Sequence, residues 1–452
     1  MPATVASPID DYLRLLTEPV ARESAGWLEE RLAQRGLFFG TRPLCNVLRP
    51  RFLTTANYDF LRARCGLLLG AFNQALAAAL ASPAVLAQFR LHDWERTLIA
   101  DDPGFIEGSP LSRLDAFFTA DTGELQFTEY NAETPAGTAY GDALAELFLA
   151  LPAMREFGRQ YALRPLPARH HVLNVLVDTW RTWSGRTGRP VIGIIDWAEV
   201  PTVSEFELFQ DYFTSMGYTC VIGDPRNLEY RNGKLSSGGV PIDIIYKRVL
   251  ISELIERGGM DQPMVRALRD GAVCMANPFR CKILHKKASL AVLSDERNAA
   301  LFTAEQRSAI LRHIPWTRVV EDRRTEFEGR TVDLMELALA ERERMVLKPN
   351  DDYGGHGIVL GWETDASGWE SALRVAIREP HIIQQRIALP SESFPSLVDG
   401  QLVLADRIVD TAPFVFNGSY VDGCLTRVST AALVNVTAGG GSTVPTFVVE
   451  KR

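Results

Sequence analysis

The first hundred residues carry apolar side chains at three- and four-residue spacing, in segments such as FLRARCGLLLGAFNQALAAAL. This is the period of a helix that buries one face, so we expect a helical N-terminal region over residues 1–105. Its Ala- and Leu-rich run, residues 65–80, contains Asn73 and Gln74 and falls short of the roughly 18 apolar residues of a transmembrane helix. We therefore predict a buried helix there and no membrane span.

Strand character starts at Ser112, in SRLDAFFTADTGELQFTEYN, and helical pattern returns in GDALAELFLALPAM. Two strand-like runs around the turn sequence DTG predict a β-hairpin. We place this hairpin and the helix that follows it in one segment, residues 106–160.

Farther along, the short apolar runs RPVIGIIDW and YTCVIGDP flank a helical pattern, SEFELFQDYFTSMG. This strand–helix–strand order is typical of a parallel sheet, and it predicts a small α/β domain over residues 161–276. Residues 277–452 show mixed strands, among them RMVLKPN and HIIQQRI, and a glycine-rich segment, TAGGG. The expected fold class is therefore α/β with α+β parts, in several domains.

Composition narrows the function classes. The formal net charge of −8 argues against a general nucleic-acid binder, because such proteins cluster Lys and Arg against phosphates. The six cysteines are scattered, without a CxxC pair or zinc-ligand spacing. With no signal-peptide pattern at the start of the sequence, we expect a cytoplasmic protein.

The predicted hairpin carries the most informative residues. If the loop DTG places Gly123 in the left-handed region, Asp115 faces Glu129 and Arg113 faces Asn131. Residues two apart share a face of a strand, so all four side chains project to one side. Opposed carboxylates repel each other and need a cation, a shared proton or open water.

Two carboxylates and an amide oxygen suit a hard cation such as Mg²⁺, which commonly bridges to substrate phosphates. The candidate ligands are Asp115, Glu129 and Asn131, and Arg113 could stabilise charge on a transferred phosphoryl group. The alternative is a solvated hairpin face with a surface Arg–Asp pair. A register slip of one residue would also scatter the four side chains over both faces.

A nucleotide site is indicated farther along the chain by VLKPNDDYGGHGI. There a strand carrying Lys348 leads into a loop with Gly354, Gly355 and Gly357, whose backbone could approach phosphates closely. A plain hairpin turn would give the same pattern.

Further candidates for this site are basic or amide side chains. Lys286 and Lys287 stand at an expected helix start in CKILHKKASL, where either could bind phosphates, unless this is a solvated helix end. Gln384 and Gln385 end a strand that could hydrogen-bond adenine. Arg427 and Asn435 precede the segment TAGGG, which could close the phosphate site or be an ordinary loop.

Together, these motifs resemble the ATP-grasp superfamily, and specifically its circularly permuted, glutathionylspermidine synthetase-like branch. The resemblance rests on RLDAF…FTEYNAETPAG, similar to the metal motif of that branch, and on VLKPNDDYGGHG with IIQQRI, similar to its nucleotide half. It covers residues 105–450, and the metal motif precedes the nucleotide half, as the permutation requires. It implies that residues 106–160 and 277–452 form one ATP-grasp module, with Mg²⁺ on the hairpin and ATP on Lys348.

The implied activity is a carboxylate–amine ligase that forms an amide or peptide bond through an acyl phosphate. The partners are then ATP, a small-molecule or peptide carboxylate and an amine, whose identities no pattern in the sequence encodes, nor does any pattern encode the oligomeric state. Where that branch uses small hydroxyl side chains after the Asn to hold glutathione, this chain has Ala132, Glu133, Thr134, Pro135, Ala136 and Gly137, which argues against glutathione as substrate. Two other readings are an ATP-dependent phosphotransferase and a non-catalytic nucleotide-binding protein.

Overall fold

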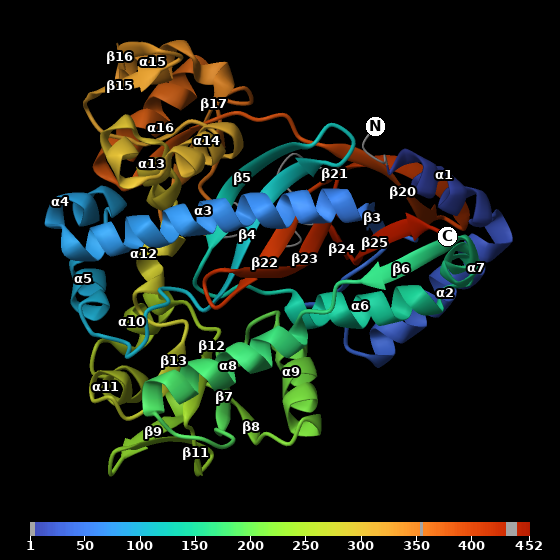
Figure 1. Cartoon of the computed structure of the whole chain (residues 1–452), viewed down its shortest axis with the longest axis horizontal. Helices are drawn as coiled ribbons and strands as arrows, with labels where there is room; N and C mark the ends of the chain where they lie inside the picture. The colour runs from blue at the N-terminus through green and yellow to red at the C-terminus, as the bar shows by residue number, and fades with distance from the viewer. Residues whose placement is uncertain (1–4, 353–355, 431–440) are drawn as a thin grey trace.

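The computed structural model describes residues 5–352, 356–430 and 441–452. Its centre is an antiparallel sheet in the order β20-β21-β23-β22-β4-β5, with β24 paired to β23 (Figure 1). The strands of this sheet are β4 (Leu111–Thr119), β5 (Glu124–Asn131), β20 (Ser391–Val398), β21 (Gln401–Val409), β22 (Ala412–Phe416), β23 (Tyr420–Ser429) and β24 (Ser442–Val444). The predicted hairpin is thus β4–β5, and it joins strands from the other end of the chain.

The pairing of β4 with β22 makes this join, since Arg113 lies opposite Phe414 in antiparallel register. Strands on both sides of the intervening α/β segment therefore form one sheet. One face of the hairpin packs on the long helix α3 (Thr55–Ala81) in a core that includes Phe72, Phe127 and Tyr130. The opposite face of the hairpin is left for the candidate site.

A second sheet is parallel, in the order β13-β12-β7-β8. Its strands are β7 (Ile192–Ile195), β8 (Cys220–Gly223), β12 (Ile244–Lys247) and β13 (Cys274–Ala276), and its helices are α8 (Arg169–Ser184), α9 (Val203–Ser215), α10 (Ile251–Gly258) and α11 (Pro263–Arg269). A small meander of η2 (Pro225–Asn227), β9 (Leu228–Arg231), β10 (Lys234–Ser237) and β11 (Val240–Pro241) follows β8. The expected strand–helix–strand unit β7–α9–β8 is present, and the α/β fold class is confirmed.

The third layer, at the top left of Figure 1, is a mixed unit around the sheet β14-β19-β17-β18. Its strands are β14 (Thr317–Val319), β17 (Met345–Pro349), β18 (Val359–Leu360) and β19 (His381–Gln385), beside the hairpin of β15 (Arg324–Phe327) and β16 (Arg330–Asp333). Its helices are α12 (Cys281–His285), α13 (Ala288–Ser294), η3 (Glu296–Leu301), α14 (Ala304–His313), α15 (Leu334–Ala340), η4 (Arg342–Arg344) and α16 (Ala366–Arg378). Lys348 and the Gln384–Gln385 pair lie on adjacent strands, β17 and β19.

The N-terminal region is helical, as expected, but it also supplies short strands. It contains α1 (Ala6–Leu15), α2 (Glu18–Gln34), β1 (Phe38–Phe39), β2 (Arg42–Pro43), β3 (Arg51–Leu53), α3, α4 (Pro83–Leu86), η1 (Ala87–Phe89) and α5 (Asp93–Ile99). Strand β3 pairs with β25 (Thr446–Lys451), which also pairs with β6 (Tyr161–Pro165), beyond α6 (Thr138–Ala150) and α7 (Pro152–Gln160). Strand β3 of the N-terminal region and the last strand, β25, thus lie side by side.

By length and composition α3 could cross a membrane. Its apolar face, however, is packed against the central hairpin and helices α13 and α14. This packing agrees with the buried helix expected from the sequence.

Candidate active site

The hairpin brings the four predicted residues together. Asp115 lies opposite Glu129 and Arg113 opposite Asn131, so the predicted pairing is confirmed. The Arg113 guanidinium donates to both carboxylate oxygens of Asp115, at 2.6 and 3.0 Å. Its third nitrogen donates to the carbonyl oxygen of Ala136 at 2.8 Å.

The route to this register differs from the expected one. The turn has four residues between the paired Thr119 and Glu124, not three, although Gly123 does adopt a positive φ of 75°. A β-bulge at Thr128 restores the pairing, because it inserts one residue between Phe127 and Glu129. The bulge also shifts the alternation, so that Phe127 faces the core while Glu129 faces the site.

Asp115 is buried and carries two arginine partners. Arg427 on β23 donates to its Oδ2 from a distance of 2.9 Å, beside the two bonds from Arg113. Burial alone raises the pKa of Asp115, but the attraction of Arg113 and Arg427 outweighs it and lowers the pKa to about 2. Asp115 is therefore a fixed anion at neutral pH.

Glu129 is paired with a lysine and remains partly accessible, with 25% of its side chain exposed. The Lys287 Nζ lies 2.9 Å from its Oε1. Burial raises the pKa of Glu129, and Lys287 more than compensates, so that its pKa is below the ordinary value. The alternative of a solvated helix end is not what surrounds this lysine, because Lys287 is buried between α12 and α13.

Lys348 lies on β17 across from the hairpin. Its Nζ donates to the side-chain oxygen of Gln384 at 2.7 Å and lies 3.4 Å from the carbonyl oxygen of Thr128, the bulge residue. Burial lowers the pKa of Lys348 to about 8, although Glu129 acts in the opposite direction. The bulge thus connects the hairpin to the lysine-bearing strand.

A cavity of about 620 Å³ lies beside these groups, a size suited to a nucleotide. Its charged lining includes Asp115, Glu129, Lys287, Lys348, Asp410 and Arg427, whereas Arg113 and Asn131 are not among its lining residues. Its apolar lining includes Val346, Ile358, Leu360, Trp362, Ile387 and Leu389, and the charged Glu343, Arg344 and Arg386 also line it. This combination of apolar and charged side chains fits a base and phosphates.

Gln384 and Gln385 both line this cavity, at the end of β19. The Gln384 side chain is already engaged, since its amide also donates to the hydroxyl of Thr317 at 2.9 Å. The Gln385 backbone N–H donates to the carbonyl of Trp316 at 2.8 Å. Gln384 therefore positions Lys348 and Thr317 in this structure, while Gln385 lines the cavity.

The remaining predicted glycine and asparagine positions divide into two groups. Gly357 is exposed and has a positive φ of 68°, and its neighbour His356 lines the cavity. Gly354, Gly355 and Asn435 lie outside the described residues.

Lys286 was predicted as a candidate phosphate contact alongside Lys287, but it does not line the cavity. Of these two lysines, Lys287 is the one that does. The Nζ of Lys286 lies 2.7 Å from Glu95 and 2.8 Å from Asp351, and its side chain is 1% exposed. Because α12 ends at His285, consecutive lysines leave the corner between α12 and α13 in different directions. We therefore leave Lys286 out of the nucleotide contacts.

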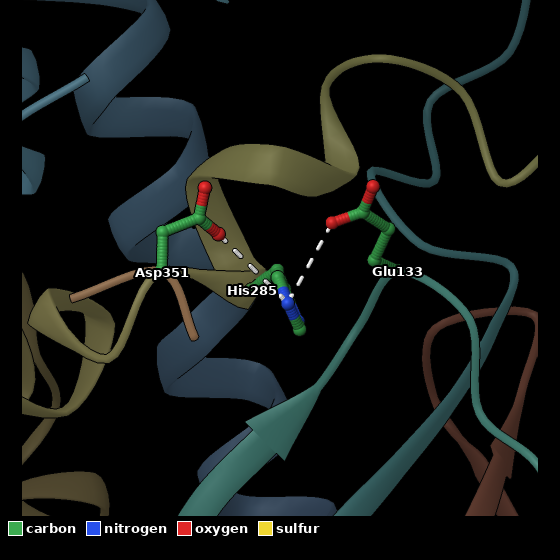
Figure 2. A group of neighbouring side chains, drawn as sticks. All are labelled: Glu133, His285 and Asp351. Carbon is green, nitrogen blue, oxygen red and sulfur yellow. Dashed lines mark ion pairs between the residues drawn. The ribbon is translucent and has the colours of Figure 1, made fainter. Parts of the chain in front are cut away.

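The charged cluster around Lys286 includes Glu133, His285 and Asp351, a combination that could in principle hold a metal (Figure 2). One observation argues against a metal there. Lys282 lies 3.0 Å from Glu133 and 2.7 Å from Asp351, so an ammonium group already bridges the carboxylates. Burial lowers the pKa of His285 to about 4, so its ring is neutral beside these ion pairs at pH 7.

Asp410 is the residue of the site that the sequence reasoning missed. It follows β21, lines the cavity and accepts from the Arg427 backbone N–H at 2.8 Å and from Nε at 2.5 Å. An acidic residue at the end of the strand pattern QLVLADRIVD is the only sign of it in the sequence.

The donor set on the hairpin fits a divalent cation. Four basic side chains, from Arg113, Lys287, Lys348 and Arg427, surround the three carboxylates of Asp115, Glu129 and Asp410. Buried opposed carboxylates that are neutralised this way could exchange part of their basic partners for a metal. The basic excess at this end of the cavity would also attract an anionic nucleotide.

No family model matches the sequence. Among curated proteins it is similar to the Frankia alni protein named "Putative glutamate--cysteine ligase 2-3", with 24% identity over 93% of this chain. The aligned region is 49% of that relative, so the chain spans about half of its length.

Among solved structures, the chain is similar to a glutathione synthetase-like effector from Globodera pallida in its apo form. The TM-score is 0.61, with 96% of this chain and 98% of the other covered, at 11% identity. The chain shares the fold of that protein, and at this identity the likeness concerns the fold alone.

Proposed function

We propose that this protein is an ATP- and Mg²⁺-dependent carboxylate–amine ligase of the circularly permuted ATP-grasp type. The observation that carries the proposal is the cavity lined by residues of β17, β19 and the hairpin, which combines apolar side chains with a cluster of lysine, arginine and carboxylate groups. The names of the two relatives, a glutamate–cysteine ligase and a glutathione synthetase-like protein, support amide-bond formation between amino acids or short peptides. We also propose that the protein is cytoplasmic. Its six free, buried cysteines agree with a reducing compartment.

In the proposed arrangement, adenine lies against the apolar wall formed by residues such as Leu360 and Trp362, and the phosphates lie beside Lys348, Lys287 and Arg427. Asp115, Glu129 and Asn131 would hold Mg²⁺, which supplies charge neutralisation between the β- and γ-phosphates. Arg113, already bonded to Asp115, would stabilise the transferring group.

The reaction then has two balanced steps. A substrate carboxylate oxygen attacks the γ-phosphorus, the bond to the bridging oxygen breaks, and ADP leaves. The amine nitrogen attacks the carbonyl carbon of the acyl phosphate, the carbon–oxygen bond to phosphate breaks, and the amine gives up a proton. Exclusion of water from the cavity would protect the acyl phosphate between the steps.

The test is ADP release by the purified chain with Mg²⁺ and a panel of acids and amines that includes glutamate, cysteine, γ-glutamylcysteine, glycine and polyamines. Mass spectrometry of the product separates the readings. An amide that forms in a fixed ratio to ADP supports ligation, whereas a stable phosphorylated acid would support a phosphotransferase. ATP binding without turnover over the whole panel would support a nucleotide-binding protein instead.

A further inference from the structure

Arg427 is shared between two carboxylates, and one of them, Asp410, lies outside the hairpin. Its Nη2 donates to Asp115 at 2.9 Å, while its Nε donates to Asp410 at 2.5 Å. The backbone N–H of Arg427 also donates to Asp410, at 2.8 Å, and the Asp410 N–H donates back to the Arg427 carbonyl at 3.0 Å. Asp410 therefore fixes both the main chain and the side chain of Arg427.

Asp115 has more basic partners than one carboxylate requires. Arg113 alone binds both of its oxygens, and Arg427 adds a third bond. With the further hydrogen bond from the Asn131 side chain, donors occupy the roughly four lone-pair sites of the carboxylate, so a metal ion at Asp115 would have to displace one of them. Within the described residues, Arg427 is the one of the two arginines that pairs with a second carboxylate.

Glu129 also binds a basic side chain that has a second acceptor. Lys287 pairs with this carboxylate at 2.9 Å and also donates to the carbonyl oxygen of Asp352. The carbonyl is a neutral anchor, whereas Asp410 is a buried carboxylate, 3% exposed, with no other cation in the described part of the chain beside it. The competition for a basic side chain is therefore strongest at Arg427.

We propose that Asp410 is a positioning residue that sets the metal affinity of the hairpin by sharing the Arg427 guanidinium, so that Arg427 makes a single hydrogen bond to Asp115. This inference rests on the proposed function, since it takes Asp115 as a metal ligand. Without the Asp410 charge, the guanidinium of Arg427 would turn fully to Asp115 and compete with the cation. Asp410 acts through Arg427 and needs no contact with the metal.

The test measures Mn²⁺ binding to the full chain without substrates, by the loss of the free-ion EPR signal. Asp410→Asn, which keeps the shape of the side chain, is expected to weaken Mn²⁺ binding roughly tenfold. Arg427→Met is expected to strengthen binding, and in that background Asp410→Asn should have little further effect. Asp406→Asn, an exposed substitution on the same strand β21, serves as the matched control and should bind like the wild type.

The cycle of single and double variants keeps the outcomes distinct. Equal Mn²⁺ affinity of Asp410→Asn and wild type would overturn the inference. A weakening that persists with Met at position 427 would also overturn it, because Asp410 would then act as a ligand itself. If the wild type binds no more Mn²⁺ than Asp115→Asn does, the metal site of the proposed function fails instead. Thermal unfolding of each variant identifies a loss of binding that comes from misfolding.

Discussion

Two clusters of acidic and basic side chains lie on either side of the corner between α12 and α13, and they differ in what their charges are available for. In the buried cluster, Lys247, Lys282 and Lys286 balance Glu95, Glu133 and Asp351, and all but Asp351, which is 16% exposed, have at most 2% of their side chains exposed. At the cavity, basic side chains outnumber carboxylates and part of the set faces solvent, including 25% of Glu129 and 19% of Arg427. A balanced buried set holds the fold together, whereas an unbalanced accessible set can still bind a ligand.

Lysine and carboxylate side chains thus stabilise the fold in one cluster and line the cavity in the neighbouring one. Glu133 follows Asn131 by two residues, yet it accepts from the Ile251 backbone N–H at 2.5 Å and from Lys282 at 3.0 Å, so it ties the hairpin to the α/β domain. The difference teaches that burial and charge balance, and not the presence of acidic residues, separate a structural cluster from a site.

The largest effect is expected from Asp115→Asn in the accessible cluster. Loss of this carboxylate removes a proposed metal ligand and leaves Arg113 and Arg427 without their shared partner. We expect ADP formation to fall by a factor on the order of 10³. Steady-state ADP release measures it, and turnover equal to the wild type would place the chemistry elsewhere.

Lys286→Met and Lys287→Met form a matched pair that probes the comparison directly. Lys286→Met leaves Glu95 and Asp351 buried with one cation fewer, so the free energy of unfolding should fall by about 3–5 kcal/mol. Lys287→Met should cost less stability but raise the KM for ATP or lower kcat, by about 10- to 100-fold. The measurements are urea unfolding and ADP release for both variants. A larger stability loss in Lys287→Met together with a larger activity loss in Lys286→Met would contradict the assignment of the two clusters.

The buried cluster should make the protein acid-sensitive through His285. Burial lowers the pKa of His285 from 6.5 to about 4, so between these values the unfolded chain binds more protons than the folded one. Stability should therefore fall as the pH drops from 6.5 to 4, by up to about 3 kcal/mol. The measurement is urea unfolding of wild type and His285→Gln across this window, in which the variant should lose that part of the slope. Parallel slopes would contradict it.

The accessible cluster should respond on the alkaline side through Lys348. Burial lowers its pKa to about 8, and only the protonated ammonium attracts phosphates. ATP affinity should therefore decrease as the pH rises through about 8, by up to about tenfold per pH unit. Over the same window the unfolded lysine keeps its proton longer, so stability should rise with pH. Isothermal titration with ATP between pH 7 and 9.5 measures the first effect, and Lys348→Arg should flatten it.

The smallest effect is expected at the far tip of the hairpin. Gly123→Ala places a side chain at a φ of 75°, with no heavy atom within 4 Å of the new Cβ. The strain should lower the free energy of unfolding by about 1 kcal/mol and leave ADP formation unchanged. A change in ADP formation would show that the turn at Gly123 is coupled, through the bulge at Thr128, to the end of the hairpin that carries Asp115 and Glu129.

The sequence by itself determined the local elements and the pairing at the end of the hairpin that carries Asp115 and Glu129. Alternation and turn residues predicted β4–β5, and apolar runs predicted the parallel sheet, because both patterns are set by which side of a strand meets the core. The pairing of Asp115 with Glu129 came out as predicted although the loop is one residue longer, because the bulge at Thr128 compensates. The order Leu125, Phe127, Tyr130 of core residues carries this shift in the sequence.

Only the tertiary structure decided which charged residues gather and with what balance. No pattern distinguishes Lys286 from Lys287, since their directions depend on a bend between two short helices. Nothing in the spacing of Asp410 and Arg427 from Asp115 indicates that the three meet, because β21, β23 and β4 are brought together by the sheet. Side-chain ion pairs act over a few ångströms. Sequence patterns indicate which face of an element is buried, but they do not indicate which distant elements pack together. That packing decides which charged side chains come within range of each other.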